Sequence, residues 1–93
     1  MCLTIAIDYD DTFTADPALW TAFVQMARAR WHAVFVTTAR FPHDLADVYA
    51  ALPDAEVIAS GGKPKANAAE AYGVGIDIWI DDSPHLIGKL TFT

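Results

Sequence analysis

Three aspartates and a threonine end the first apolar segment of this chain, in the run Asp8-Tyr9-Asp10-Asp11-Thr12. Side chains two residues apart in an extended segment point to the same side, so Asp8 and Asp10 can face one ligand. Carboxylates at the edge of a hydrophobic core are costly unless a cation meets them. Because hard cations such as Mg²⁺ prefer carboxylate oxygens, this run predicts a magnesium site.

Apolar runs that alternate with amphipathic segments predict the elements that position these side chains. We expect strands at residues 3–9, 33–38, 56–59, 76–80 and 89–93, and helices at 17–30, 42–52 and 64–72. Asp16 before Pro17 is typical of a helix start, and Gly73 of a helix end. Strands alternating with helices favour right-handed crossovers and a parallel sheet. The sequence therefore predicts a single α/β domain over residues 1–93, with a three-layer, doubly wound, Rossmann-like sheet of about five strands.

Polar side chains follow each of the first four predicted strands. Ligands of doubly wound sheets bind outside the carboxyl ends of the strands, where these side chains would lie. After the second, third and fourth strands come, in order, Thr37 and Thr38, Lys63 and Lys65, and Asp81 and Asp82. These hydroxyls, ammonium groups and carboxylates would join Asp8 and Asp10 at one edge. A divalent cation, with a lysine across the site, would balance the carboxylate charge.

This ordered set resembles the four motifs of the haloacid dehalogenase superfamily of phosphohydrolases. The matching residues are Asp8, Asp10 and Thr12 for the first motif, Thr38 for the second, Lys63 for the third, and Asp81 with Asp82 for the fourth. Thr37 and Lys65 are the alternative candidates for the second and third motifs. The superfamily often has Gly after the second aspartate, whereas this chain has Asp11, a residue that tolerates unusual backbone angles.

The resemblance implies a Mg²⁺-dependent phosphomonoester hydrolase, or phosphatase, that acts through an aspartyl-phosphate. Asp8 would be the nucleophile, and Asp10 the general acid and then the base. Thr38 would hydrogen-bond a phosphoryl oxygen, and Lys63 would neutralise the charge on the aspartyl-phosphate. The implied ligands of Mg²⁺ are Asp8, the backbone carbonyl of Asp10, Asp82 and, in or beside the coordination shell, Asp81.

Members of this superfamily usually carry a cap inserted after the first or the third strand. Here only the 20 residues 13–32 separate Thr12 from the second strand, and residues 60–63 form a short connection, so no cap domain is expected. An open site favours a large phosphorylated substrate, or a second subunit that acts as a lid. The short segment after Asp82 would leave one edge of the sheet exposed, which favours a homodimer.

Composition argues against several classes of partner. The formal net charge is -6, and only six Lys and Arg residues are present, so long nucleic acids and anionic membranes are not expected ligands. No apolar run approaches the roughly 20 residues needed to span a bilayer. The single cysteine and the absence of a secretory signal pattern favour a cytoplasmic location.

Two other function classes fit part of the pattern. A receiver-type regulatory domain, which accepts a phosphoryl group or binds a metal, also gathers Asp, Thr and Lys at strand ends. Receivers place the acceptor aspartate after the third strand, where this chain has Ala59-Ser60. A degenerate member of the phosphohydrolase superfamily would bind a partner without catalysis. For Arg40, an ion pair at the surface is expected over contact with a substrate phosphate.

Overall fold

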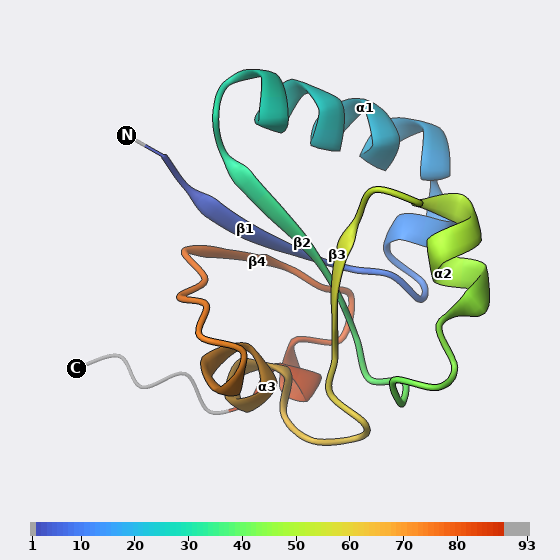
Figure 1. The fold of residues 1–93 in the computed structure, drawn as a ribbon, viewed down its shortest axis with the longest axis vertical. Helices are drawn as coiled ribbons and strands as arrows, with labels where there is room; N and C mark the ends of the chain where they lie inside the picture. Colours follow the sequence, from blue (N-terminus) through green and yellow to red (C-terminus); the bar gives the residue numbers. More distant parts are fainter. Residues whose placement is uncertain (1, 89–93) are drawn as a thin grey trace.

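Four parallel strands form the sheet, and their carboxyl ends meet at one edge (Figure 1). The structure is a computed structural model in which residues 2–88 are described. The strands are β1 (Thr4–Asp8), β2 (Ala33–Thr38), β3 (Glu56–Ala59) and β4 (Ile78–Ile80), in the order β3-β2-β1-β4. The predicted parallel sheet is confirmed for these four strands. The strand predicted at residues 89–93 lies outside the described residues.

Helices cover both faces of the sheet. They are α1 (Pro17–Ala29), α2 (Ala46–Ala51) and α3 (Lys65–Ala71), with short 3₁₀ turns η1 (Phe13–Ala15) and η2 (Pro84–Leu86). Helix α1 lies on one face and α3 on the opposite face (Figure 1). The layout is consistent with the Rossmann-like arrangement of three layers that the alternating elements predict.

The hydrophobic core lies between α1, α2 and one face of the sheet. Its buried members are Ile7, Tyr9, Phe13, Val24, Ala27, Val34, Val36, Leu45, Val48 and Val57. Alternate residues of a strand point to opposite faces, so Ile7 faces this core and Asp8 points to the other side of β1. Apolar packing on one face therefore fixes the strand that carries Asp8, while Asp8 itself is aimed toward the layer of α3.

Helix starts follow local chemistry, with one difference from the prediction. The Asp16 carboxylate accepts a hydrogen bond from the Leu19 N–H at 3.2 Å, which confirms the predicted N-cap of α1. Helix α2 begins at Ala46, four residues later than predicted. The reason is a turn, closed by a 2.9 Å hydrogen bond from the Asp44 N–H to the Phe41 carbonyl, which occupies the preceding segment.

Short connections follow the strands that carry the polar edge. Residues 9–16 join β1 to α1 and contain η1, and residues 60–64 join β3 to α3. Both segments are short, and neither contains an inserted domain. Across residues 2–88, none of the helices has both the length and the apolar character needed to cross a bilayer.

Candidate functional site

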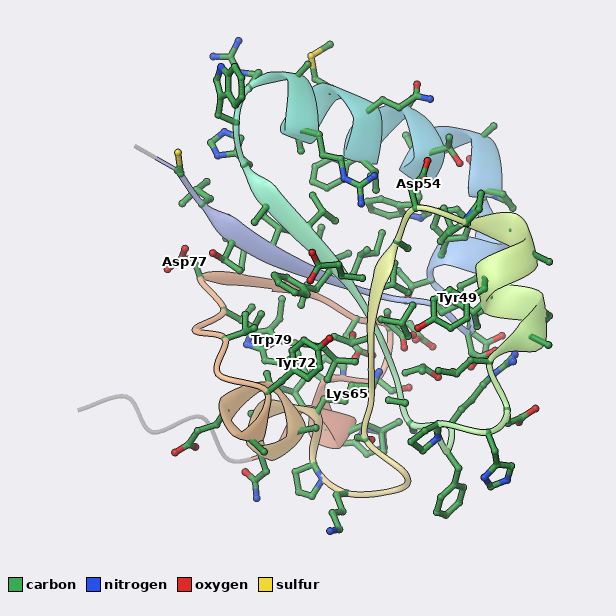
Figure 2. The ribbon with its side chains drawn as sticks, in the orientation of Figure 1. Tyr49, Asp54, Lys65, Tyr72, Asp77 and Trp79 are labelled. Carbon is green, nitrogen blue, oxygen red and sulfur yellow. The ribbon has the colours of Figure 1, made fainter. Side chains whose placement is uncertain are left out.

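A buried lysine joins two aspartates from distant parts of the chain. Lys65 Nζ lies 2.6 Å from Asp8 Oδ1 and 2.7 Å from Asp81 Oδ2, and none of these side chains is more than 6% exposed. Figure 2 shows Lys65 between α3 and the strands. Asp8 ends β1 and Asp81 follows β4, and between these strands the strand order reverses. Ligands of doubly wound sheets bind at such a reversal.

The structure reverses the predicted order of the two lysines. Lys63 is exposed in the connection before α3, whereas Lys65 is the first residue of that helix and is buried. Side chains of a helix tilt toward its N-terminus, which here faces the carboxyl edge of the sheet. A 2.8 Å hydrogen bond from the Ala66 N–H to the Ile87 carbonyl ties the start of α3 to the segment after Asp81. Lys65, and not Lys63, is therefore the lysine of this cluster.

Thr12 connects Asp8 to the last aspartate of the pair. Its hydroxyl lies 3.2 Å from Asp8 Oδ2 and 3.1 Å from Asp82 Oδ1, and it accepts the Asp82 N–H at 3.1 Å. A hydroxyl carries one proton, so it can donate to only one of the two carboxylates at a time. We call Asp8, Thr12, Lys65, Asp81 and Asp82 the lysine cluster. The predicted meeting of Asp8 with the Asp81-Asp82 pair is confirmed.

The lysine cluster has the composition of a divalent cation site. Oxygen atoms of Asp8, Asp81 and Asp82 lie within 4.8 Å of one another. Three ionised carboxylates against the one ammonium of Lys65 leave an excess of two negative charges, which is the charge of one divalent cation. Carboxylate oxygens suit hard cations such as Mg²⁺ and Ca²⁺. These residues could therefore hold a metal ion.

Burial and neighbouring charges shift the ionisation of this cluster. Burial raises the pKa of Asp8 to about 6, although the hydrogen bond from Lys65 acts in the opposite direction. Burial lowers the pKa of Lys65, but hydrogen bonds to Asp8 and Asp81 outweigh it and leave that pKa raised. A hydrogen bond with the Asp8 side chain lowers the pKa of Asp82. Of Asp8 and Asp82, Asp8 is therefore the carboxylate that stays protonated up to the higher pH.

A second cluster surrounds Asp10, which does not belong to the carboxylate group at Lys65. The extended segment that would have made Asp8 and Asp10 face the same way ends at Asp8, and the chain turns after it. Arg40 donates from Nη2 to Asp10 Oδ1 at 2.7 Å and from Nε to Asp10 Oδ2 at 3.0 Å, and it also pairs with Asp47 through Nη1. Its guanidinium carbon lies 5.5 Å from the centre of the Tyr9 ring. We call Asp10, Thr38, Arg40 and Asp47 the arginine cluster. The ion-pair interpretation of Arg40 is confirmed, but sequence reasoning did not identify Asp10 as its partner.

The two threonines at the end of β2 differ in what their hydroxyls contact. Thr38 Oγ1 donates to Asp10 Oδ2 at 3.3 Å and accepts the Arg40 N–H at 3.2 Å. Thr37 is aligned with Asp8 across the sheet and is 1% exposed. Its hydroxyl, like that of buried Ser60, has no hydrogen-bond partner among the described residues. Buried hydroxyls normally find partners, so Thr37 has a donor available for a ligand beside Asp8.

Asp11 adopts a left-handed backbone conformation, which glycine adopts most readily. Its φ is 64°, and its N–H donates to Thr14 Oγ1 at 2.9 Å. Aspartate tolerates this conformation better than most residues, which explains how the turn forms without glycine. The structure therefore confirms that this turn forms with aspartate at the position.

Substitutions at Asp11 should report this conformational demand. We expect Asp11→Val to lower the free energy of unfolding by about 1–2 kcal/mol, because a β-branched side chain clashes at positive φ, and Asp11→Gly to change it by less than about 1 kcal/mol. Urea unfolding of both variants checks this expectation. Equal losses in the two variants would show that the turn does not require positive φ.

Comparison with known proteins adds no family to this description. No protein-family model, no curated protein and no solved structure matches the chain. The interpretation of its function therefore depends on the two clusters and on the motifs that carry them.

Proposed function

We propose that this chain is a Mg²⁺-dependent phosphomonoester hydrolase of the haloacid dehalogenase type, with Asp8 as its nucleophile. The observation that carries the proposal is the convergence of Asp8, Lys65 and the Asp81-Asp82 pair at the reversal point of a parallel sheet. The order of the motifs along the chain supports it independently of this geometry. Bound Mg²⁺ would orient the phosphoryl group and offset its negative charge.

In the proposed reaction, a carboxylate oxygen of Asp8 attacks phosphorus while the bond from phosphorus to the leaving oxygen breaks. Lys65 sits against Asp8 and can stabilise the negative charge on the transferred group. The unpartnered hydroxyl of Thr37 can donate to a phosphoryl oxygen. We therefore propose Lys65 and Thr37, in place of Lys63 and Thr38, as the groups that contact the phosphoryl group.

Asp10 would transfer protons to the leaving group and from the attacking water. It lies two residues after Asp8, and its side chain is 46% exposed, so a leaving group and water have access to it. A carboxylate pairs with a guanidinium in its ionised form, which is the form that accepts a proton from water. The Arg40 pair thus favours the second step, hydrolysis of the aspartyl-phosphate. Donation to the leaving group requires that Asp10 gain a proton and loosen its contact with Arg40.

The Arg40 contact also favours a second candidate, a phospho-acceptor regulatory domain. If Arg40 kept Asp10 from serving as an acid and base, a phosphoryl group on Asp8 would persist. Hydrolysis of p-nitrophenyl phosphate by the full chain, with and without Mg²⁺, separates the two functions. Repeated Mg²⁺-dependent turnover supports the hydrolase. A single phosphoryl group that remains on Asp8 supports the regulatory domain.

Magnesium binding should depend on pH through Asp8. A metal ion binds the ionised carboxylate, so a proton on Asp8 competes with Mg²⁺ below its pKa of about 6. Raising the pH from 5 to 7 should therefore tighten binding about tenfold, because the ionised fraction rises by that factor. Titration calorimetry at these pH values measures the effect. Asp8→Asn should bind Mg²⁺ more weakly and with little pH dependence. If the Mg²⁺ affinity of the wild-type chain is the same at pH 5 and pH 7, the expectation is contradicted.

A further inference from the structure

An aromatic pair stands at the same edge of the sheet as the two clusters and takes no part in them. Phe41 and His43 lie in the turn after β2, and their rings stack with centroids 5.7 Å apart and planes 19° apart. Phe41 is 55% exposed, and His43 is exposed as well. The exposed phenyl ring of Phe41 costs free energy in water, and its stacking on the flat imidazole of His43 offers an aromatic surface that a ligand can cover.

The backbone around Phe41 holds its ring in place. The Gly61 and Gly62 N–H groups donate to the Arg40 and Ala39 carbonyls at 2.9 and 2.8 Å, which pins the turn after β2 to the turn after β3. Gly61 has a φ of 61°, and a Cβ there would stand 3.2 Å from Phe41 Cδ1. Glycine at this position lets the ring pack closely on the backbone. The ring therefore packs on the neighbouring turn without a ligand, and a packed ring has less conformational entropy to lose when a ligand stacks on it.

The aromatic pair belongs to the turn whose Arg40 contacts Asp10, two residues after Asp8. Phe41 directly follows Arg40, whose guanidinium contacts Asp10, and it comes three residues after Thr38, whose hydroxyl contacts the same carboxylate. Three residues span at most roughly 11 Å. A phosphoryl group at Asp8 with its leaving group directed past Asp10 would place that leaving group over the turn of Phe41 and His43.

Charge around the turn limits what the leaving group carries. Asp44 and Asp47 are exposed beside it, and Arg40 is already paired with Asp10 and Asp47. Lys63, which is exposed in the adjoining turn after β3, is one cation beside these two carboxylates. Further phosphates would meet these carboxylates and be repelled. A single phosphate joined to an uncharged aromatic body suits this combination of ring stack and acidic rim.

We propose that Phe41 and His43 form a stacking platform for the leaving group of the proposed hydrolase. The substrate class is then a phosphate monoester of an alcohol that bears a flat aromatic ring, as in a nucleoside monophosphate. This inference rests on the proposed function, because the aromatic ring belongs to a leaving group only if the chain is a hydrolase. Stacking on an aromatic side chain is worth roughly 1–3 kcal/mol per base, or about 5- to 150-fold in affinity.

Adenosine monophosphate and glycerol 3-phosphate test the platform, because both carry one phosphate and only the first carries an aromatic ring. Calorimetric binding to the whole Asp8→Asn chain, at a Mg²⁺ concentration that saturates this variant, measures recognition without turnover. We expect adenosine monophosphate to bind at least about fivefold more tightly, and Phe41→Ala to remove this preference. Trp31→Ala is the matched control, since Trp31 is 82% exposed but lies between α1 and β2, at the opposite edge of the sheet.

Steady-state kinetics of the catalytically intact chain supply the second readout. Phe41→Ala should raise KM for adenosine monophosphate by about fivefold or more, with kcat/KM for glycerol 3-phosphate within about twofold of wild type. Equal binding of the two compounds, or equal losses for both in Phe41→Ala, would overturn the platform. If neither compound is hydrolysed while the binding preference and its loss in Phe41→Ala persist, the hydrolase proposal fails and the platform stands.

Discussion

Asp8→Asn is expected to reduce Mg²⁺-dependent hydrolysis of phosphate monoesters by about 10⁴-fold or more. The amide has nearly the shape of the carboxylate but cannot act as the nucleophile, so no aspartyl-phosphate can form. Asp8 is also one of the three carboxylates of the candidate metal site, and its Oδ1 contacts Lys65 at 2.6 Å. A loss of activity alone would therefore not distinguish a missing nucleophile from a missing metal ion.

Asp82→Asn is the matched control for this substitution. Asp82 belongs to the same group of oxygens but is exposed and is not positioned against Lys65. If it serves only to bind Mg²⁺, its variant should recover a large part of the activity when Mg²⁺ is raised to saturation. Asp8→Asn should stay inactive at every Mg²⁺ concentration. Turnover that returns in Asp8→Asn at high Mg²⁺ would end the assignment of Asp8 as nucleophile.

The parts of this site that the sequence predicted are those that depend on topology. Carboxyl ends of parallel strands share one edge, so the end of β1 and the end of β4 had to lie on the same side of the sheet. Their adjacency follows from the reversal of strand order, which brings Asp8 to Asp81 and Asp82. Alternating apolar segments were enough to predict these strands and the helices between them.

The sequence could not decide which of two neighbouring residues of the same type joins the site. Lys63 and Lys65 both follow β3, and the choice between them depends on the residue at which α3 begins. Thr37 and Thr38 point to opposite faces of β2, so their roles depend on the register between β1 and β2, which packing sets.

Long-range contacts of loops were the least predictable part of the site. Arg40 lies 30 residues from Asp10 in sequence, and their contact depends on the conformation of the turn that follows β2. The turn also delays the start of α2 and brings Phe41 against Gly61. The only signals in the sequence were a basic residue two positions after a strand-end threonine and two consecutive glycines after β3. Neither signal specifies its partner.

Lys65→Met is expected to lower the free energy of unfolding by about 3–5 kcal/mol, because it leaves two buried carboxylates without their cation. The Asp8 and Asp81 side chains are 6% and 1% exposed, so water cannot replace the ammonium. Lys63→Met is the matched control. Lys63 is exposed, and its variant should stay within about 0.5 kcal/mol of wild type. Urea unfolding measures the free energies of both variants. The slope of free energy against urea concentration should equal that of wild type, so that the comparison reports stability alone.

A double-mutant cycle separates the ion pair from the packing of the lysine side chain. Asp8→Asn made in the Lys65→Met background should cost less than the same substitution in the wild-type chain, because the isolated carboxylate it removes is itself destabilising. The expected coupling is about 0.5–3 kcal/mol. If the losses of unfolding free energy in the cycle are additive, Lys65 stabilises the fold by packing alone. If Lys63→Met loses as much unfolding free energy as Lys65→Met, the buried ammonium has no special role. Without a metal ion, Lys65 is the cation that offsets the carboxylates of the lysine cluster. If the coupling is large, Mg²⁺ should take over this role when Lys65 is absent. Mg²⁺ should then protect Lys65→Met against unfolding more than it protects the wild-type chain.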